Sequence, residues 1–217
     1  MRYGDIAVSL ANDFDLTLPK ETPIFEPFDL APLIADSPFS IGLVVGASGS
    51  GKTQALKTIW EPSADVRWEA DRCVADHFNS KEAAQTCLTG AGLNSIPQWM
   101  KPHALLSNGE QYRANLARLL YRSRYETAPQ NRKAIIVDEF TSVVDRVVAR
   151  SLCEALRRFT AGNDQIVLAT CHFDVADWLK PDWIVDVMDH TVTRGERFSK
   201  PQWKSLLYAK AGVLTRG

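Results

Sequence analysis

A glycine-rich stretch constrains this chain more than any other feature of its sequence. Residues 46–53 read G-A-S-G-S-G-K-T, directly after the apolar run 41–45 and directly before residues 54–60, which have a helical pattern. Glycines let such a loop adopt positive φ angles and approach an anion without a Cβ in the way. The loop amides then point inward at the positive end of the following helix. The order of strand, glycine loop and helix predicts a phosphate-binding loop and argues against the alternative, a Gly/Ser-rich hairpin.

The pattern G-x-x-x-x-G-K-T also assigns roles to individual residues of the loop. Lys52 is predicted to place its charge on the β and γ phosphates of a nucleotide, and Thr53 to give its hydroxyl to Mg²⁺. The other predicted nucleotide contacts in this region are Gly46, Ser48, Gly49, Ser50, Gly51 and Gln54. A phosphate loop by itself says only that a nucleotide binds, so the reaction must be inferred from other residues.

Composition excludes several other classes of protein. The 217 residues are 45% hydrophobic and 24% charged, which is ordinary for a soluble globular protein with a substantial core. The formal net charge of −1 gives no support for strong overall attraction to nucleic acid or to a membrane. Four scattered cysteines without a C-x-x-C pair fit reduced thiols, and no apolar run approaches the roughly 18 residues of a membrane helix. The N-terminus lacks the apolar core of a signal peptide, so we expect a cytoplasmic protein.

Apolar runs alternate with helical patterns along most of the chain. The predicted strands are 41–45, 134–137, 165–170 and 183–188. The predicted helices are 54–60, 81–88, 110–125 and 148–159. Ser80 is the expected N-cap of the second helix and Gly90 its stop. This alternation predicts an α/β fold of the phosphate-loop NTPase class, with a mostly parallel sheet flanked by helices.

Two segments outside this alternation carry predictions of further strands. Within residues 1–40, apolar and polar residues alternate over 14–18, which predicts a half-exposed strand in a small N-terminal β layer. Residues 66–68 are predicted to form another short strand.

Two acids directly follow the apolar run 134–137. Asp138 lies where a carboxylate holds the Mg²⁺ shell in phosphate-loop enzymes. Glu139, the next residue, is placed to orient or deprotonate an attacking water. Acids are also common turn residues after a strand, but that alternative weakens once the loop at 46–53 is accepted.

Two further stretches place polar residues at the ends of predicted elements. Ser107, Asn108 and Gly109 directly precede a predicted helix, where a hydroxyl and free helix amides form a second anion site. Two such sites in one chain indicate a model in which two copies share nucleotides. The alternative is an ordinary Ser N-cap, which is preferred for this peptide in isolation. His172 follows the strand 165–170 and is predicted to reach a γ-phosphate, although a lone histidine there is more often structural.

The predicted helix 110–125 also carries several arginines. They are Arg113, Arg118, Arg122 and Arg124. We interpret them as a solvated basic face. The alternative is an anion surface that contacts nucleic acid, and such binding would weaken steeply with salt.

Together these residues resemble the ATP-binding cassette (ABC) family over roughly residues 40–190. The glycine loop resembles the family's Walker A motif, 106–111 its signature L-S-G-G-[QE], and 135–139 its Walker B with the catalytic glutamate. Asp145 resembles the D-loop aspartate, and His172 the switch histidine. Five motifs in the right order make a chance match improbable.

The resemblance implies an enzyme, an ATP hydrolase that works with ATP and Mg²⁺. The residues to which it gives catalytic roles are Glu139, His172 and Lys52. Asp145 joins the nucleotide contacts. Two departures stand out: Asn108 replaces the first signature glycine, which Asn can do because it tolerates φ > 0, and no glutamine occupies the Q-loop. His77 lies about where that glutamine belongs and is taken as its stand-in among the metal ligands.

The spacing of two motifs and several short sequence segments point to a narrower group within the ABC family. Lys52 and Ser107 lie 55 positions apart, fewer than in transporter cassettes, which implies a shortened helical subdomain over about 62–125 within a single ABC-type ATPase domain, 1–217. In transporter cassettes, the part that is missing here is the one that contacts the membrane subunits. Several phrases, L-S-N-G-E-Q among them, resemble the soluble ABC-type ATPases that are fused to, or encoded with, GNAT-type acetyltransferases.

The leading hypothesis is therefore a soluble ATPase that forms an ATP-dependent homodimer around two ATP molecules. The narrower resemblance implies that closure acts on an acetyltransferase, on a nucleic-acid-modifying enzyme or on nucleic acid. One alternative is the ATPase subunit of an ABC membrane transporter, although membrane contact is not expected. The other is a non-hydrolysing scaffold, against which Glu139 and His172 argue.

Overall fold

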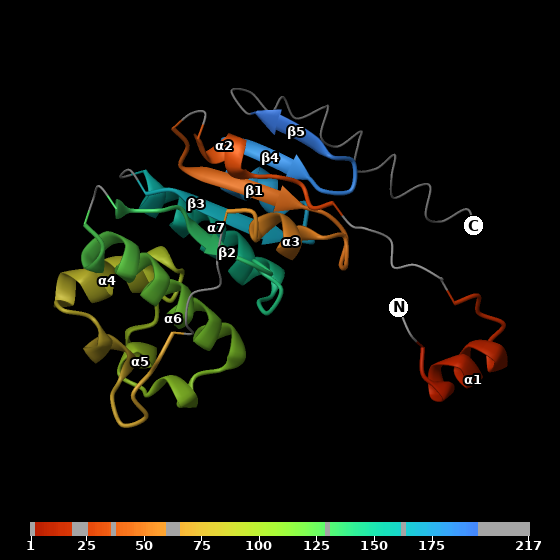
Figure 1. Cartoon of the computed structure of the whole chain (residues 1–217). Coiled ribbons are helices and arrows are strands. Elements are labelled where there is room, and N and C mark those ends of the chain that lie inside the picture. Colours follow the sequence, from red (N-terminus) through yellow and green to blue (C-terminus); the bar gives the residue numbers. More distant parts are fainter. Residues whose placement is uncertain are drawn as a thin grey trace.

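The computed structural model describes residues 3–18, 26–35, 38–59, 66–128, 131–161 and 164–194. A five-stranded sheet with strand order β2-β3-β1-β4-β5 forms its centre (Figure 1). The strands are β1 (Ile41–Val45), β2 (Ile135–Val137), β3 (Ile166–Thr170), β4 (Trp183–Asp186) and β5 (Thr191–Arg194). The four strands predicted from apolar runs are confirmed, three of them with shorter limits.

The sheet is mostly parallel, as predicted. β1 pairs in parallel with β3 and β4, and β3 pairs in parallel with β2. Parallel strands are covered on both faces, and every residue of β1, β2 and β3 is buried. β5 runs antiparallel to β4 at the edge, and all four of its residues are exposed. No apolar run marks β5, so sequence periodicity did not reveal it.

The two faces of the sheet pack against different helices, because successive strand residues point to opposite faces. Leu43 lies in a core with α4, α6 and α7, whereas Val44 lies in a second core with α2 and α3. The bounds of these helices are α2 (Ala31–Ala35), α3 (Lys52–Leu56), α4 (Lys81–Gly90), α6 (Asn108–Tyr121) and α7 (Arg146–Thr160). The predicted flanking of the sheet by helices is confirmed (Figure 1).

Between α3 and β2, the described part of the chain is helical apart from loops and one β-bridge, Cys73 to Pro102. Besides α4 and α6, its elements are η1 (Val74–His77), α5 (Ile96–Trp99), η2 (His103–Leu105) and the π-helical turn η3 (Arg122–Glu126). The predicted strand at 66–68 is wrong, because these residues are irregular and have no ladder partner in the described chain. The helical subdomain and the single-domain assignment remain predictions.

Helix α4 shows how local sequence sets a helix and its ends. Ser80 is the N-cap, as predicted, and its Oγ accepts a hydrogen bond from the Ala83 amide at 3.1 Å. The stop is Gly92 rather than Gly90: Gly92 has φ +73°, and the following Leu93 N–H donates to the carbonyl of Leu88 at 2.9 Å. This is a Schellman motif, in which glycine occupies the left-handed position.

The expected N-terminal β layer is not present in the described part of residues 1–40. Helix α1 (Asp5–Asp13) lies there instead. Asp15 has φ +50°, and the N–H of Leu16 donates to the carbonyl of Ala11 at 2.7 Å, which again closes a helix with a Schellman motif. The alternation over 14–18 therefore reflects a helix end and not a strand.

The remaining described helix, α8 (Val175–Leu179), follows β3 and contacts α7. None of the helices in the described ranges combines the length and the apolarity that spanning a membrane requires.

Candidate active site

The carboxyl ends of three adjacent strands carry the predicted chemistry. The order of β2, β3 and β1 in the sheet and their parallel direction place their carboxyl ends at one edge. The glycine loop follows β1, Asp138 follows β2, and Cys171 follows β3. Open α/β sheets bind ligands at this edge.

Two glycines of the loop are required by its geometry. Gly51, which precedes α3, has φ +94°, a region that residues with a Cβ rarely adopt. At Gly46, a Cβ would lie 2.4 Å from Ser50 Oγ and 2.8 Å from Val187 Cγ2. That Ser50 hydroxyl is buried without a hydrogen-bond partner in the described structure. An orphaned buried donor in a glycine loop fits a loop whose partner is an anion.

Lys52 lies over the loop that precedes it. Its Nζ donates to the carbonyl oxygens of Gly46 at 3.0 Å and Ala47 at 2.7 Å. An ammonium group has three donors, so one remains for a phosphate oxygen at the mouth of the loop.

Thr53 and Asp138 meet across the edge of the sheet. Thr53 Oγ1 donates to Asp138 Oδ2 at 2.6 Å, while Asp138 Oδ1 accepts from the Glu139 amide at 2.8 Å. A hydroxyl beside a carboxylate is a hard oxygen pair of the kind that Mg²⁺ takes from protein, with the other ligands coming from substrate phosphates and water. The described ranges hold no cluster of three or more His, Cys, Asp or Glu residues suited to a metal.

A cavity of about 400 Å³ opens at this site. Its lining residues are Ser48, Gly49, Gly51, Lys52, Thr53, Gln54, Asp138, Glu139, Ser142 and Cys171. Eight of these were predicted as site residues from the sequence. Ser142 and Cys171 were not predicted as site residues, although Ser142 lies three residues before Asp145 and Cys171 directly precedes His172.

The loop after β2 has unusual backbone geometry. Glu139 and Thr141 have φ angles of +50° and +69°, in the left-handed region that costs non-glycine residues energy. Glu139 is exposed and faces the cavity, and its carbonyl accepts from the Ser142 amide at 3.0 Å. The turn thus places the Glu139 carboxylate at the cavity beside Asp138.

His172 does not line the cavity, but its neighbour Cys171 does. The imidazole Nδ1 lies 2.9 Å from Oγ1 of Thr141, and the His172 amide donates to Oγ1 of Thr170 at 3.0 Å. The histidine is therefore held from both its ring and its backbone at the end of β3.

The predicted second anion site lies at the start of α6, away from the cavity lining. Ser107 is the N-cap, and both its amide and its Oγ donate to Glu110 Oε2, at 2.9 and 2.8 Å. These bonds hold the pKa of Glu110 below its ordinary value. Asn108 is the first helical residue and has no positive φ, so its tolerance of that region is not what preserves the turn. A Cβ on Gly109 would lie 3.3 Å from the carbonyl oxygen of Val143.

Asp145 also lies at a helix start. Its Oδ1 accepts from the amides of Val147 and Val148, both at 2.9 Å, and so caps α7. Asp145 does not line the cavity, and its contact with nucleotide stays a prediction.

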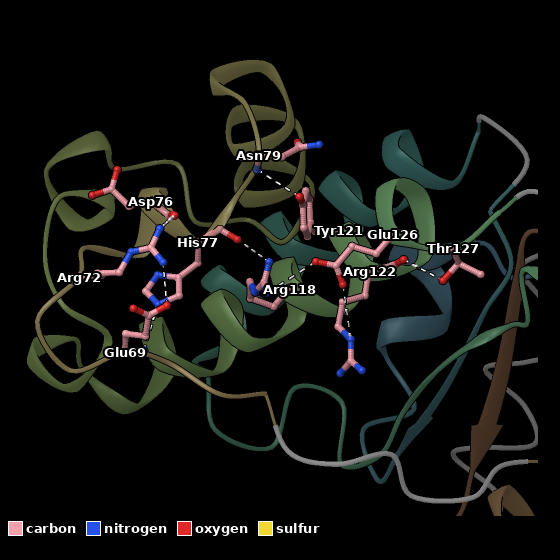
Figure 2. Close-up of polar contacts among 10 residues, drawn as sticks. All are labelled: Glu69, Arg72, Asp76, His77, Asn79, Arg118, Tyr121, Arg122, Glu126 and Thr127. Atoms are coloured by element: carbon pink, nitrogen blue, oxygen red, sulfur yellow. Dashed lines mark hydrogen bonds and ion pairs between the residues drawn. The ribbon is translucent and has the colours of Figure 1, made fainter.

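His77 is placed away from the candidate metal ligands, in the network that joins residues 69–79 to α6 (Figure 2). Its Nε2 accepts from the Glu69 amide at 3.0 Å, so Nδ1 carries the hydrogen and donates to the Cys73 carbonyl at 3.0 Å. The ring also packs edge-on against Trp68. Because both nitrogens are used, a neutral His77 has no lone pair left for a metal, which removes its predicted role.

Two of the four arginines on the predicted basic face bind groups elsewhere in the fold. Arg113 donates to the carbonyls of Gly109 and Gly92, both at 3.0 Å. Arg124 forms an ion pair with Asp164, whose side chain is only 1% exposed. Breaking such a buried pair by removing one partner is costly because the other charge stays buried.

The other two arginines meet at one carboxylate (Figure 2). Arg118 donates to the His77 carbonyl and lies 3.8 Å from Glu126, and Arg122 lies 3.9 Å from the same side chain. All four arginines thus have internal partners. Arg113, Arg118 and Arg124 are held by buried or backbone partners and do not form a solvated basic face, whereas Arg122 is 43% exposed and fits that interpretation.

The sequence matches no protein-family model and no curated protein. Solved structures do match its fold. The dimeric post-hydrolysis structure of the ATP-binding cassette MJ0796, bound to ADP and Pi, shares 16% identity at a TM-score of 0.52, covering 73% of this chain and 86% of that one. CbiO1 from Clostridium perfringens, part of the ABC transporter complex cbiONQ, shares 14% at a TM-score of 0.52, covering 81% and 82%.

The chain has the fold of an ATP-binding cassette. A bacterial Atm1-family ABC exporter with ATP bound has a similar fold, with 14% identity and a TM-score of 0.53. The match covers 82% of this chain and 36% of the exporter chain. At such identities the likeness establishes the cassette fold, and the function of this cassette must be argued from its own residues.

Proposed function

We propose that this cassette binds ATP with Mg²⁺ and hydrolyses it. The observation that carries the proposal is the 2.6 Å contact between Thr53 Oγ1 and Asp138 Oδ2, in a cavity that Lys52 and Glu139 also line. A phosphate loop, a hard oxygen pair and a free carboxylate are the three parts that phosphoryl transfer to water requires.

Each part has one role in the proposed reaction. The loop amides and Lys52 hold the β and γ phosphates, and Thr53 and Asp138 hold the metal. Mg²⁺ supplies charge neutralisation on the phosphate oxygens. Glu139 orients a water molecule and accepts its proton as the water oxygen bonds to the γ-phosphorus. The bond from that phosphorus to the β–γ bridging oxygen breaks, which yields ADP and phosphate.

Glu139→Gln tests this role directly. The amide keeps the shape of the side chain but does not accept the proton, and loss of a general base lowers turnover by about 10²–10⁴. Affinity for MgATP should stay within about twofold, because the loop and the metal ligands are intact. Glu154→Gln, on exposed α7 surface, is the matched control. Near-normal turnover in Glu139→Gln would remove Glu139 from the mechanism. If the wild-type protein releases phosphate no faster than buffer without protein, the non-hydrolysing scaffold hypothesis would be favoured.

We further propose that two copies close on two ATP molecules, each held between the loop of one copy and the α6 start of the other. The reason is positional: Asn108 and Gly109 present the first amides of a 14-residue helix, and neither they nor the N-cap Ser107 line the cavity of their own chain. The dimeric MJ0796 cassette shows that this fold accommodates dimers.

The dimer is tested in the Glu139→Gln background by light scattering. ATP with Mg²⁺ should double the mass, and Ser107→Arg should prevent this without weakening ATP binding to the monomer. Ser95→Arg is the matched control, since Ser95 is an exposed N-cap that makes no side-chain cap bond. A Ser107→Arg variant that still dimerises with ATP would contradict the shared site.

We propose that closure acts on a separate macromolecule, either an acetyltransferase or a nucleic-acid-modifying enzyme. The support for this proposal is that the motifs of this chain resemble those of cassettes encoded with acetyltransferases. Purification of the ATP-bound Glu139→Gln form from its native lysate, against the nucleotide-free form as control, should enrich one such enzyme. Enrichment of membrane permease subunits instead would favour the transporter alternative.

A further inference from the structure

The contact between Thr141 and His172 joins two loops of the candidate site. Thr141 follows β2, His172 follows β3, and their Oγ1 and Nδ1 atoms lie 2.9 Å apart although 31 positions separate the residues. Thr141 is completely buried, whereas His172 is partly exposed beside the cavity residue Cys171. A buried hydroxyl thus touches the ring of a histidine whose position in the sequence motif predicts contact with a γ-phosphate.

The backbone of Thr141 is strained. Its φ of +69° lies in the left-handed region, where a β-branched residue is an outlier. The preceding residue anchors the turn: Phe140 is fully buried, and its amide donates to the Ala169 carbonyl of β3 at 2.7 Å. Strain held in place by surrounding structure at a candidate site points to a functional requirement for the strained side chain.

Hydrogen-bond satisfaction decides which group is the donor. The Thr141 hydroxyl is out of reach of solvent, and His172 Nδ1 is the one partner recorded for it within the described residues. If Nδ1 carried a hydrogen and donated, the Thr141 hydrogen would be buried without an acceptor, which is unfavourable. Thr141 therefore donates, Nδ1 accepts, and the hydrogen of the neutral ring lies on Nε2.

We propose that Thr141 is a positioning residue that fixes the orientation of the His172 ring and keeps its hydrogen on Nε2. The amide of His172, bonded to Thr170 Oγ1, fixes the backbone from the other side. His172 then presents a neutral N–H donor at the edge of the site. The identity of its acceptor, an oxygen of the γ-phosphate, rests on the proposed function.

The tautomer is measurable without ATP. Long-range ¹H–¹⁵N spectra of the whole chain distinguish Nε2–H from Nδ1–H, and His172→Gln assigns the signal among four histidines. The wild type and Thr141→Ser should show Nε2–H with Nδ1 as an acceptor. Thr141→Val keeps the branched shape and the strained backbone but lacks the hydroxyl, so it should show both tautomers. Wild-type Nδ1–H, or an unchanged tautomer in Thr141→Val, would overturn the proposal.

Tyr112→Phe is the matched control for a nearby lost hydroxyl. Burial raises the pKa of Tyr112, and the nearby Thr141 backbone lowers it by a smaller amount. The phenol oxygen of Tyr112 makes no hydrogen bond of good geometry within the described residues. Removing it leaves the Thr141–His172 bond in place, so the tautomer should not change. If Thr141→Val does not fold, Thr141→Ala carries the same comparison.

Kinetics separate positioning from general stability. Thr141→Val should lower kcat about tenfold with KM within about twofold, by analogy with the loss of a residue that orients a metal-ligating histidine. In a His172→Gln background the same substitution should lower kcat no further, because the two residues act as one unit. Equal losses in both backgrounds would overturn the proposal. If the wild type does not hydrolyse ATP, the proposed function fails while the tautomer result still decides the role of Thr141.

Discussion

Thr53 Oγ1 and Asp138 Oδ2 lie 2.6 Å apart although 85 positions of sequence separate them. Thr53 lies in the first turn of α3 after β1, and Asp138 directly follows β2, two strands away in the sheet. Their contact converts two local motifs into one metal-binding unit.

Asp138→Asn should weaken binding of MgATP by about 10- to 100-fold and leave binding of metal-free ATP within twofold. The amide keeps an oxygen near Thr53 but loses the charge that favours a divalent cation. Calorimetric titrations with Mg²⁺ and with EDTA measure both affinities. Asp71→Asn, at an exposed loop position, is the control. An equal loss with and without Mg²⁺ would show that Asp138 supports the fold of the loop and not the metal.

Gly90→Ala should destabilise the protein although alanine favours a helix. A Cβ at this position would lie 2.6 Å from Cδ2 of Phe159, a buried residue of α7. Overpacking costs about 1–3 kcal/mol, and the helix propensity of alanine returns about 1 kcal/mol. Urea denaturation should therefore show a net loss of about 1 kcal/mol. In a Phe159→Leu background the loss should shrink, and an unchanged loss there would rule out this steric cause.

Cys171 should react with a maleimide before the other cysteines, and MgATP should slow its reaction several-fold. Its side chain is exposed and lines the cavity, while Cys87 and Cys153 are buried and Cys73 is half-buried. Mass spectrometry of labelled peptides measures each site separately. Cys73 supplies an internal control that nucleotide should not affect. Labelling of Cys171 at one rate with and without MgATP would place the nucleotide elsewhere.

Stability should fall as the pH rises above 9. Burial raises the pKa of the Cys87 and Cys153 thiols from 9.0 to about 12, so in this range the unfolded chain loses thiol protons that the folded chain keeps. The unfolded state then binds fewer protons, and each thiol removes up to about 1.4 kcal/mol per pH unit. Urea titrations at pH 8, 9 and 10 measure the slope. A Cys87→Ala/Cys153→Ala variant with the same slope would contradict this assignment.

Local signals account for the parts of the fold that were predicted. The strands β1 to β4 are apolar runs because parallel strands are buried on both faces. The glycine loop is recognisable because consecutive residues impose its backbone. Helix ends were harder: Asp15 and Gly92 both occupy left-handed positions of Schellman motifs, and only the second is a glycine. The edge strand β5 lacks an apolar run, since its pairing with β4 and not burial makes it a strand.

The sequence by itself determined the phosphate loop, the acids after β2 and the order of strands and helices, because each depends on neighbouring residues. Only the tertiary structure decided which distant groups meet. It gave Arg118 and Arg124 internal partners, used both nitrogens of His77, and set the Thr141 hydroxyl against His172. Such contacts join residues tens of positions apart, and their distances depend on how the strands are ordered in the sheet, which no local pattern encodes.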